Sequence, residues 1–246
     1  MIMMPLVKHI GIKQMTDIVF LIPGNSFSPE FLSAWTATIN MLNKNNIKSI
    51  ARFGYSPIIT EIRNDLLGYS PVGLPDYNEE IRDIFAGKFE CSKIVFIDSD
   101  IIWTPNDMKI LLESDKDVIC GIYPLSDKTH VSITQDGITF LTKEDLKNKD
   151  TIFEIHSGGL GFLSVSFNAL NKLKFPWFEI EQFESLQYGK GLIGEDILFF
   201  NKLRDLGYTI YADSRIKLGH LKSNILTICS KKYVSKLQKG GICVGI

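Results

Sequence analysis

The stretch IVFIDSDIIWTP, residues 94–105, sets an apolar run against two carboxylates and then returns to apolar residues. Its first four residues are β-branched or aromatic, which predicts a buried strand. Asp98 and Asp100 follow directly, where alternation along a strand directs both side chains to one side. Two carboxylates facing one point repel each other unless a cation lies between them or one is protonated. The alternative is a solvated turn with a capping Asp, but the apolar residues 101–103 disfavour it.

Strand and helix patterns alternate in the sequence on both sides of this stretch. Ser28 and Pro29 open a helical pattern, and Thr104 and Pro105 open another directly after the carboxylates. We expect strands at 17–24, 47–56, 92–100, 116–124 and 208–213, a hairpin near 135–141, and helices at 28–46, 57–68, 78–89, 105–114, 167–173 and 195–207. Alternating strands and helices predict an α/β fold with a mixed, mostly parallel central sheet flanked by helices.

Composition narrows the class of protein. The 246 residues are 45% hydrophobic and 22% charged, which suits one large globular domain or two small ones, with enough apolar residues for a core. The formal net charge is −1, so a general nucleic-acid binder is not expected. Four scattered cysteines, without a CxxC pair, suggest reduced thiols and a cytoplasmic location, the host cytoplasm if the protein is viral. No apolar run is long enough for a transmembrane segment.

The domain boundaries follow from these patterns. We expect an N-terminal extension at 1–16, one domain at 17–221 and a tail at 222–246 that ends in KGGICVGI. The oligomeric state is left open.

A second stretch distinguishes between the two interpretations of Asp98 and Asp100, a cation site and a solvated turn. It is GLIGEDILFFNKLRDLGYTIYADSRIKLGH, residues 191–220. Together with FIDSDI it resembles the nucleotide-sugar glycosyltransferases of the GT-A fold, a Rossmann-like fold, and ITEIRNDLL resembles a helix of bacteriophage and giant-virus members. In that family an Asp-x-Asp motif, an acidic pair opening a later helix and a following His occur in this order. The likeness spans about residues 17–221.

The resemblance implies an enzyme that transfers a sugar from a nucleoside-diphosphate sugar to a hydroxyl of a glycan or other acceptor. UDP-sugars are the usual donors in this family, so a UDP-sugar is the expected donor. It implies that Asp98, Asp100 and His220 bind Mn²⁺ or Mg²⁺, which neutralises the leaving diphosphate. It also implies that Asp196, beside Glu195 at a helix start, removes the proton of the acceptor hydroxyl, as in inverting transferases. The charge of both carboxylates also suits a helix N-terminus without any catalytic role.

Further residues are candidates for substrate contacts. For the donor they are Pro23, Gly24 and Asn25 in IPGNSF, Arg63, Asp98, Ser99 and Asp100, and Gly159 in HSGGLGF. Arg63 fits an exposed helix salt bridge almost as well. Trp177 and Phe178 are candidates for stacking on an acceptor sugar, although cover over the core is the commoner role for such residues.

Two other functions remain open from the sequence. FIDSDIIWT also resembles the nucleophile strand of haloacid-dehalogenase-type phosphatases, with Asp98 as nucleophile and Asp100 as acid. However, that family normally begins with this strand, and its later Lys and paired-Asp motifs are not recognisable here. The third reading is an inactive sugar-nucleotide-binding protein, which would be expected to have lost the acidic pair or His220.

Overall fold

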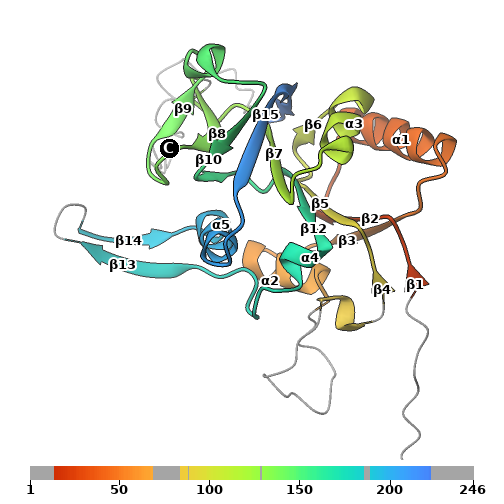
Figure 1. The fold of residues 1–246 in the computed structure, drawn as a ribbon, viewed down its shortest axis with the longest axis horizontal. Coiled ribbons are helices and arrows are strands. Elements are labelled where there is room, and N and C mark those ends of the chain that lie inside the picture. The colour runs from red at the N-terminus through yellow and green to blue at the C-terminus, as the bar shows by residue number, and fades with distance from the viewer. Residues whose placement is uncertain (1–13, 69–83, 88, 128, 186–188, 223–246) are drawn as a thin grey trace, which may run out of the picture.

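A seven-stranded mixed sheet forms the centre of the molecule (Figure 1). The computed structural model describes residues 14–68, 84–87, 89–127, 129–185 and 189–222. In sheet order the strands are β10 (Ile152–Ile155), β15 (Ile210–Lys217), β7 (Val118–Ile122), β12 (Phe162–Ser166), β5 (Lys93–Ile97), β2 (Ile18–Pro23) and β3 (Ser49–Gly54). Pairs β2–β3, β2–β5 and β15–β7 are parallel, whereas both pairs of β12 and the pair β10–β15 are antiparallel. The mixed α/β architecture is confirmed, with a larger antiparallel share than expected.

Helices cover both faces of this sheet, as Figure 1 shows. One face carries α1 (Pro29–Lys44) and α3 (Pro105–Glu113), and the other carries α2 (Ile59–Leu66), α4 (Phe167–Leu170) and α5 (Glu195–Asp205). Strand β2 is buried throughout, and its residues alternate between the two cores: Phe20 packs on the α1 side and Leu21 on the α2 side. The continuous apolar strands of this sequence are therefore strands buried on both faces.

The helices begin and end where the sequence predicts. Ser28 Oγ accepts the N–H of Phe31, and Thr104 and Asp107 form a reciprocal capping box with Pro105 at the first helical position. Gly68, with φ 113°, follows α2, and Gly207, with φ 86°, follows α5, a backbone conformation that glycine adopts without strain. Most of the helix expected at 78–89 lies outside the described residues; Ile84–Gly87 within it is a 3₁₀ turn, η1.

Smaller sheets surround the central one. They are formed by β1 (Gln14–Met15) with β4 (Phe89–Glu90), by β8 (His130–Thr134) with β9 (Phe140–Thr142) and β11 (Ser157–Gly158), by β13 (Glu181–Ser185) with β14 (Gly189–Ile193), and by β6 (Ile101–Ile102) with β16 (Gly219–His220). The β8–β9 hairpin is the predicted one, and the 3₁₀ turn η2 (Asp145–Asn148) follows it. The β13–β14 pair, expected as a loop, projects from the body of the molecule (Figure 1).

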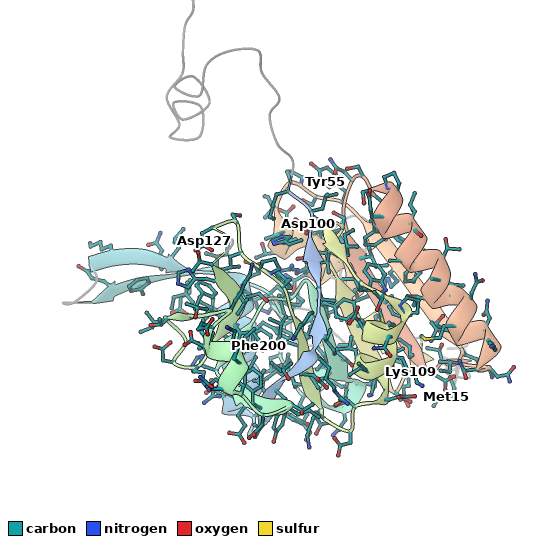
Figure 2. All side chains as sticks on the ribbon, turned by 90° about the horizontal axis from the view of Figure 1, so that it is seen from above. Met15, Tyr55, Asp100, Lys109, Asp127 and Phe200 are labelled. Carbon is teal, nitrogen blue, oxygen red and sulfur yellow. The ribbon has the colours of Figure 1, made fainter. Side chains whose placement is uncertain are left out.

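The segments that carry polar side chains lie together at one edge of the central sheet, the edge formed by the ends of its strands. Strands β2, β3 and β5 run parallel and end at this edge, whereas the antiparallel strand β12 begins there, after the glycine-rich segment 158–161. In the view of Figure 2, Asp100 and Tyr55 lie toward one side of the molecule, and Met15 and Lys109 lie toward the opposite side. Within the described residues, no helix has the length and apolarity needed to cross a membrane.

Candidate functional site

The two aspartates of the Asp-x-Asp stretch lie in a turn after β5. This strand ends at Ile97, and Ile101 N–H donates to Asp98 O at 3.1 Å, which closes the turn before β6. Because residues 98–100 are not a continuation of the strand, the alternation that would align the two carboxylates does not apply. Asp98 turns toward Arg63 and Asp100 toward His220. The prediction that both carboxylates face a single point is therefore wrong, because the two side chains contact different partners.

Arg63 is a buried cation between two of the predicted acidic residues. Its Nη2 donates to both oxygens of Asp98, at 2.9 and 3.1 Å, and its Nη1 donates to Glu195 Oε1 at 2.5 Å. Arg63 is only 4% exposed, so the exposed salt bridge considered from the sequence is excluded. Burial lowers the pKa of Arg63, but Asp98 and Glu195 outweigh it, and the pKa is raised. This guanidinium is therefore charged and joins helix α2, the β5 turn and helix α5.

Asp100 is contacted by two other basic groups. His220 Nε2 lies 3.2 Å from Asp100 Oδ2, and Lys222 Nζ donates to the same oxygen at 2.9 Å. His220 Nδ1 is 2.7 Å from the carbonyl oxygen of Pro124, so Nδ1 donates a hydrogen bond there. Because a carboxylate only accepts, Nε2 hydrogen-bonds to Asp100 in the protonated ring, whereas in the neutral ring its lone pair is available to a metal ion. The pairing of β16 with β6 holds this arrangement, since His220 is in register with Ile101.

Asp196 lies in the first turn of α5, next to Glu195. Its Oδ1 accepts the N–H of Ile197 at 2.8 Å, and it forms no ion pair with a described residue. Burial, and then the negative charge of Glu195, raise the pKa of the Asp196 carboxyl above its ordinary value. Arg63 opposes this shift from its place beside Glu195. Asp196 is thus a partly buried carboxylate with greater basicity than an exposed one.

The loop after β2 contacts the turn that carries the aspartates. Gly24 N–H donates to Gly54 O at 2.8 Å, which places the start of IPGNSF over the end of β3. A Cβ on Gly24 would lie 2.5 Å from Ser99 Cβ, so glycine is required for this close approach. Pro23 is the last residue of β2, and Asn25 is exposed beyond it. The donor candidates Gly24 and Ser99 are therefore neighbours.

The glycine-rich segment packs against Tyr123. A Cβ on Gly159 would lie 1.8 Å from Tyr123 Oη, and a Cβ on Gly161 would lie 3.1 Å from Tyr123 Oη and 3.2 Å from Asp98 Oδ2. Asp98 N–H donates to Gly161 O at 3.0 Å. Burial, and then the charge of Asp98, raise the pKa of Tyr123, so its hydroxyl stays protonated. The Tyr123 ring also meets the His220 ring edge to face at 5.1 Å.

Trp177 and Phe178 belong to the core. Each is 1% exposed, and Phe178 stacks on Phe199 of α5 with ring centroids 4.8 Å apart. Asn64 fixes this segment: its Oδ1 accepts the N–H groups of Trp177 and Phe178 at 3.1 Å, and its Nδ2 donates to Phe178 O at 2.8 Å. Their rings are not available to an acceptor sugar, and cover over the core, the alternative left open, is their role.

Comparisons with solved structures find similar proteins at low sequence identity. It matches A197 from STIV over 88% of its length and 100% of that chain, with 19% identity and a TM-score of 0.47. It also matches the catalytic domain of Drosophila β1,4-galactosyltransferase 7 in complex with xylobiose (89% and 78% covered, 12% identity, TM-score 0.46) and GalNAc-T7 with UDP, GalNAc and Mn²⁺ (84% and 44% covered, 10% identity, TM-score 0.46). No protein-family model and no curated protein matches the sequence.

The predicted metal ligands fit a divalent cation in chemical type. Carboxylate oxygens and a neutral imidazole are ligands that Mn²⁺ accepts, and Asp100 with His220 already forms a pair. Asp98, by contrast, directs both oxygens at Arg63. Among residues 14–222, as far as they are described, no group of three or more His, Cys, Asp or Glu is arranged to hold an ion. Two of the three predicted ligands are thus together, and the third is held by an internal cation.

Sequence reasoning missed two residues of this site. Tyr123 follows the buried strand β7 and precedes Pro124, and a Tyr at the carboxyl end of the predicted strand that follows the motif strand in sequence was an available signal. Lys222 had been assigned to the tail, where no local pattern distinguishes it from the other lysines. It reaches Asp100 only because the β6–β16 pairing returns the chain to the site.

Proposed function

We propose that this chain is a metal-dependent glycosyltransferase that moves a sugar from a nucleoside-diphosphate sugar, a UDP-sugar in the first instance, to a hydroxyl of a glycan acceptor. The observation that carries the proposal is the convergence of Arg63, Asp98, Asp100, Glu195 and His220 at one edge of the sheet. These residues come from four separate segments of the chain. Ligands of α/β proteins bind at this edge, outside the carboxyl ends of the strands.

The donor diphosphate would be bound at the turn that follows β5. A divalent cation held by Asp100 and His220, together with Asp98, would neutralise the charge that develops on the leaving diphosphate. Lys222 is a further cation beside Asp100. Gly24 and Ser99 lie in contact, so the loop proposed to bind the nucleoside adjoins the turn proposed to bind the diphosphate.

Asp196 is the proposed proton acceptor. Its raised pKa, caused by burial and by Glu195, makes it a stronger base than a solvated aspartate. It would take the proton of the acceptor hydroxyl as that oxygen attacks the anomeric carbon, which inverts the configuration of the sugar. Glu195, paired with Arg63, acts as a positioning residue that joins α5 to the Asp98 turn.

The test is a panel of sugar nucleotides incubated with Mn²⁺ and with oligosaccharide acceptors, with nucleotide release and product anomers measured. Transfer from one donor, lost in Asp100→Ala and dependent on the metal, is the expected result. The matched control is Asp150→Ala, an exposed aspartate outside the site. Metal-independent turnover, or full activity in Asp100→Ala, would overturn the proposal.

The same protein preparation also tests the alternative function, a haloacid-dehalogenase-type phosphatase. An Asp98 nucleophile would hydrolyse p-nitrophenyl phosphate and would be blocked by fluoroberyllate. We expect neither, because both oxygens of Asp98 accept hydrogen bonds from Arg63. Binding of a sugar nucleotide without any turnover would instead favour the inactive binding protein.

A further inference from the structure

A cavity adjoins the Asp98–Asp196 site through Tyr123 and Pro124, and four lysines are among the residues that line it. Its volume is about 590 Å³, within the range of pockets that hold one small molecule. Lys143, Lys147, Lys149 and Lys217 line it, from the end of β9, from η2 and the residue after it, and from β15. No Asp or Glu is among the described residues that line it. A cavity with this charge favours an anionic ligand.

Two of the four lysines are available for such a ligand. Lys147 pairs with Glu144 at 2.7 Å, and Lys149 donates to Gln135 Oε1 at 2.7 Å. Lys143 and Lys217 form no ion pair with any described residue. They come from different elements, so the cavity brings together two charges that local sequence does not pair.

The interior of the cavity is apolar. Ile122 and Val131 are each 3% exposed and Leu218 is 7% exposed, and with Leu146 they form its floor. A ligand that used only its charge would leave this floor in contact with water. The floor therefore favours a ligand with an apolar body next to its anionic group.

Lysine binds phosphate as a point charge, without the planar, bidentate geometry by which arginine binds phosphates and carboxylates alike. Lysines at several points of a cavity can therefore contact different oxygens of one phosphate group. No arginine is among the described lining residues. We propose that this cavity binds a molecule that carries a phosphate group on an apolar body. The proposal does not depend on the transferase assignment.

The cavity and the candidate active site share a wall. Pro124 lines the cavity and accepts the hydrogen bond of His220 Nδ1 at 2.7 Å, and Leu218 N–H donates to Ile122 O at 2.8 Å two residues before His220. Occupation of the cavity would thus fix the backbone that orients the imidazole.

The experiment is calorimetric titration of the full chain with octyl phosphate below its critical micelle concentration. Octyl glucoside, which has the same apolar chain without charge, and inorganic phosphate, which has the charge without the chain, are the ligand controls. We expect saturable binding of octyl phosphate, weakened by added salt, and weaker binding of both controls by roughly tenfold or more.

Variants locate the binding. Lys143→Gln/Lys217→Gln should weaken octyl phosphate binding at least tenfold, and Lys143→Arg/Lys217→Arg should restore part of it. Lys48→Gln/Lys109→Gln, the matched change at exposed lysines elsewhere, should leave it unchanged. Equal binding of octyl glucoside or of inorganic phosphate, or equal loss in the control variant, would overturn the proposal. Unchanged thermal unfolding verifies that each variant is folded.

A phosphate on an apolar body can belong to a membrane lipid or to a soluble compound. Co-sedimentation with phosphatidylcholine vesicles that contain phosphatidic acid, and not with phosphatidylcholine alone, would assign the ligand to a membrane. Binding of octyl phosphate without co-sedimentation would assign it to a soluble compound. Both results retain the cavity as the site.

Discussion

At the scale of single residues, Arg63 determines how the acidic groups are arranged. A fully buried guanidinium is stable only because Asp98 and Glu195 neutralise it, and each carboxylate in turn depends on it. The sequence offered Arg63 either as a donor-binding residue, which stays a prediction, or as a surface charge, which its burial excludes. The ion pair with Arg63 offsets part of the cost of placing the Asp98 carboxylate beside apolar residues.

Replacement of this cation should destabilise the whole fold. Arg63→Met leaves Asp98 and Glu195 partly buried without a partner, so we expect a loss of about 3–5 kcal/mol in the free energy of unfolding. Urea denaturation measures it, with the exposed Arg204→Met as control. A loss equal to that of the control would show that the ion pairs contribute nothing to stability.

Asp196 should set the acidic limb of the pH–rate profile. Its pKa is raised, so the folded protein keeps this carboxyl protonated up to a higher pH than an ordinary aspartate, and transfer should fall below that pH. Glu195→Gln removes the second cause of the shift and should move the limb to lower pH. Asp196→Asn should retain donor binding and lose transfer. Measurement of kcat/KM against pH tests this, and a limb that stays in place in Glu195→Gln contradicts it.

Lys222 should compete with a metal ion for Asp100. Its ammonium lies 2.9 Å from Asp100 Oδ2, where a cation bound to this carboxylate would be repelled. Lys222→Gln should therefore bind Mn²⁺ several-fold more tightly by calorimetry, whereas Lys190→Gln, an exposed lysine paired with Glu184, should not change the affinity. Weaker binding in Lys222→Gln would indicate that the lysine supports the metal site.

At the scale of elements, Asn64 connects α2 to the segment before β13. In a buried position, the Asn64 side chain forms hydrogen bonds with two backbone N–H groups and one backbone carbonyl. Asn64→Leu leaves these groups unpaired and should cost roughly 2–4 kcal/mol. Asn168→Leu, at an exposed position, is the control in the same denaturation experiment. Near-neutral behaviour of Asn64→Leu would mean that the segment adopts other partners.

The sequence predicted most elements because their signals are local. Caps at Ser28 and Thr104, glycines after α2 and α5, and the apolar strands all act within a few residues. The turn at Asp98–Asp100 was missed because it looks like a strand in a period-two pattern, and the β13–β14 pair because its strands alternate poorly. Contacts such as Lys222 with Asp100 join residues far apart in the chain, which no local pattern specifies.

At the scale of the whole molecule, basic side chains in the site should make the fold independent of a metal. Arg63, His220 and Lys222 already contact the carboxylates that a metal would bind. Treatment with EDTA should leave the melting temperature of the free protein unchanged, yet abolish the stabilisation by UDP with Mn²⁺, which ligand linkage puts at about 2.7 kcal/mol at one hundred times the dissociation constant. Unfolding by EDTA alone would show that a structural metal holds the chain together.

The position of β12 has a consequence for the order of assembly. This strand lies between β5 and β7, so β2, β3 and β5 on one side and β7, β15 and β10 on the other share no direct pairing. A nascent chain that has emerged only as far as residue 150 contains β5 and β7 but not the strand that joins them. Strands β5 and β7 can be joined only after Ser166 has left the ribosome; until then β5 has an open edge, and β7 has no partner strand in the central sheet.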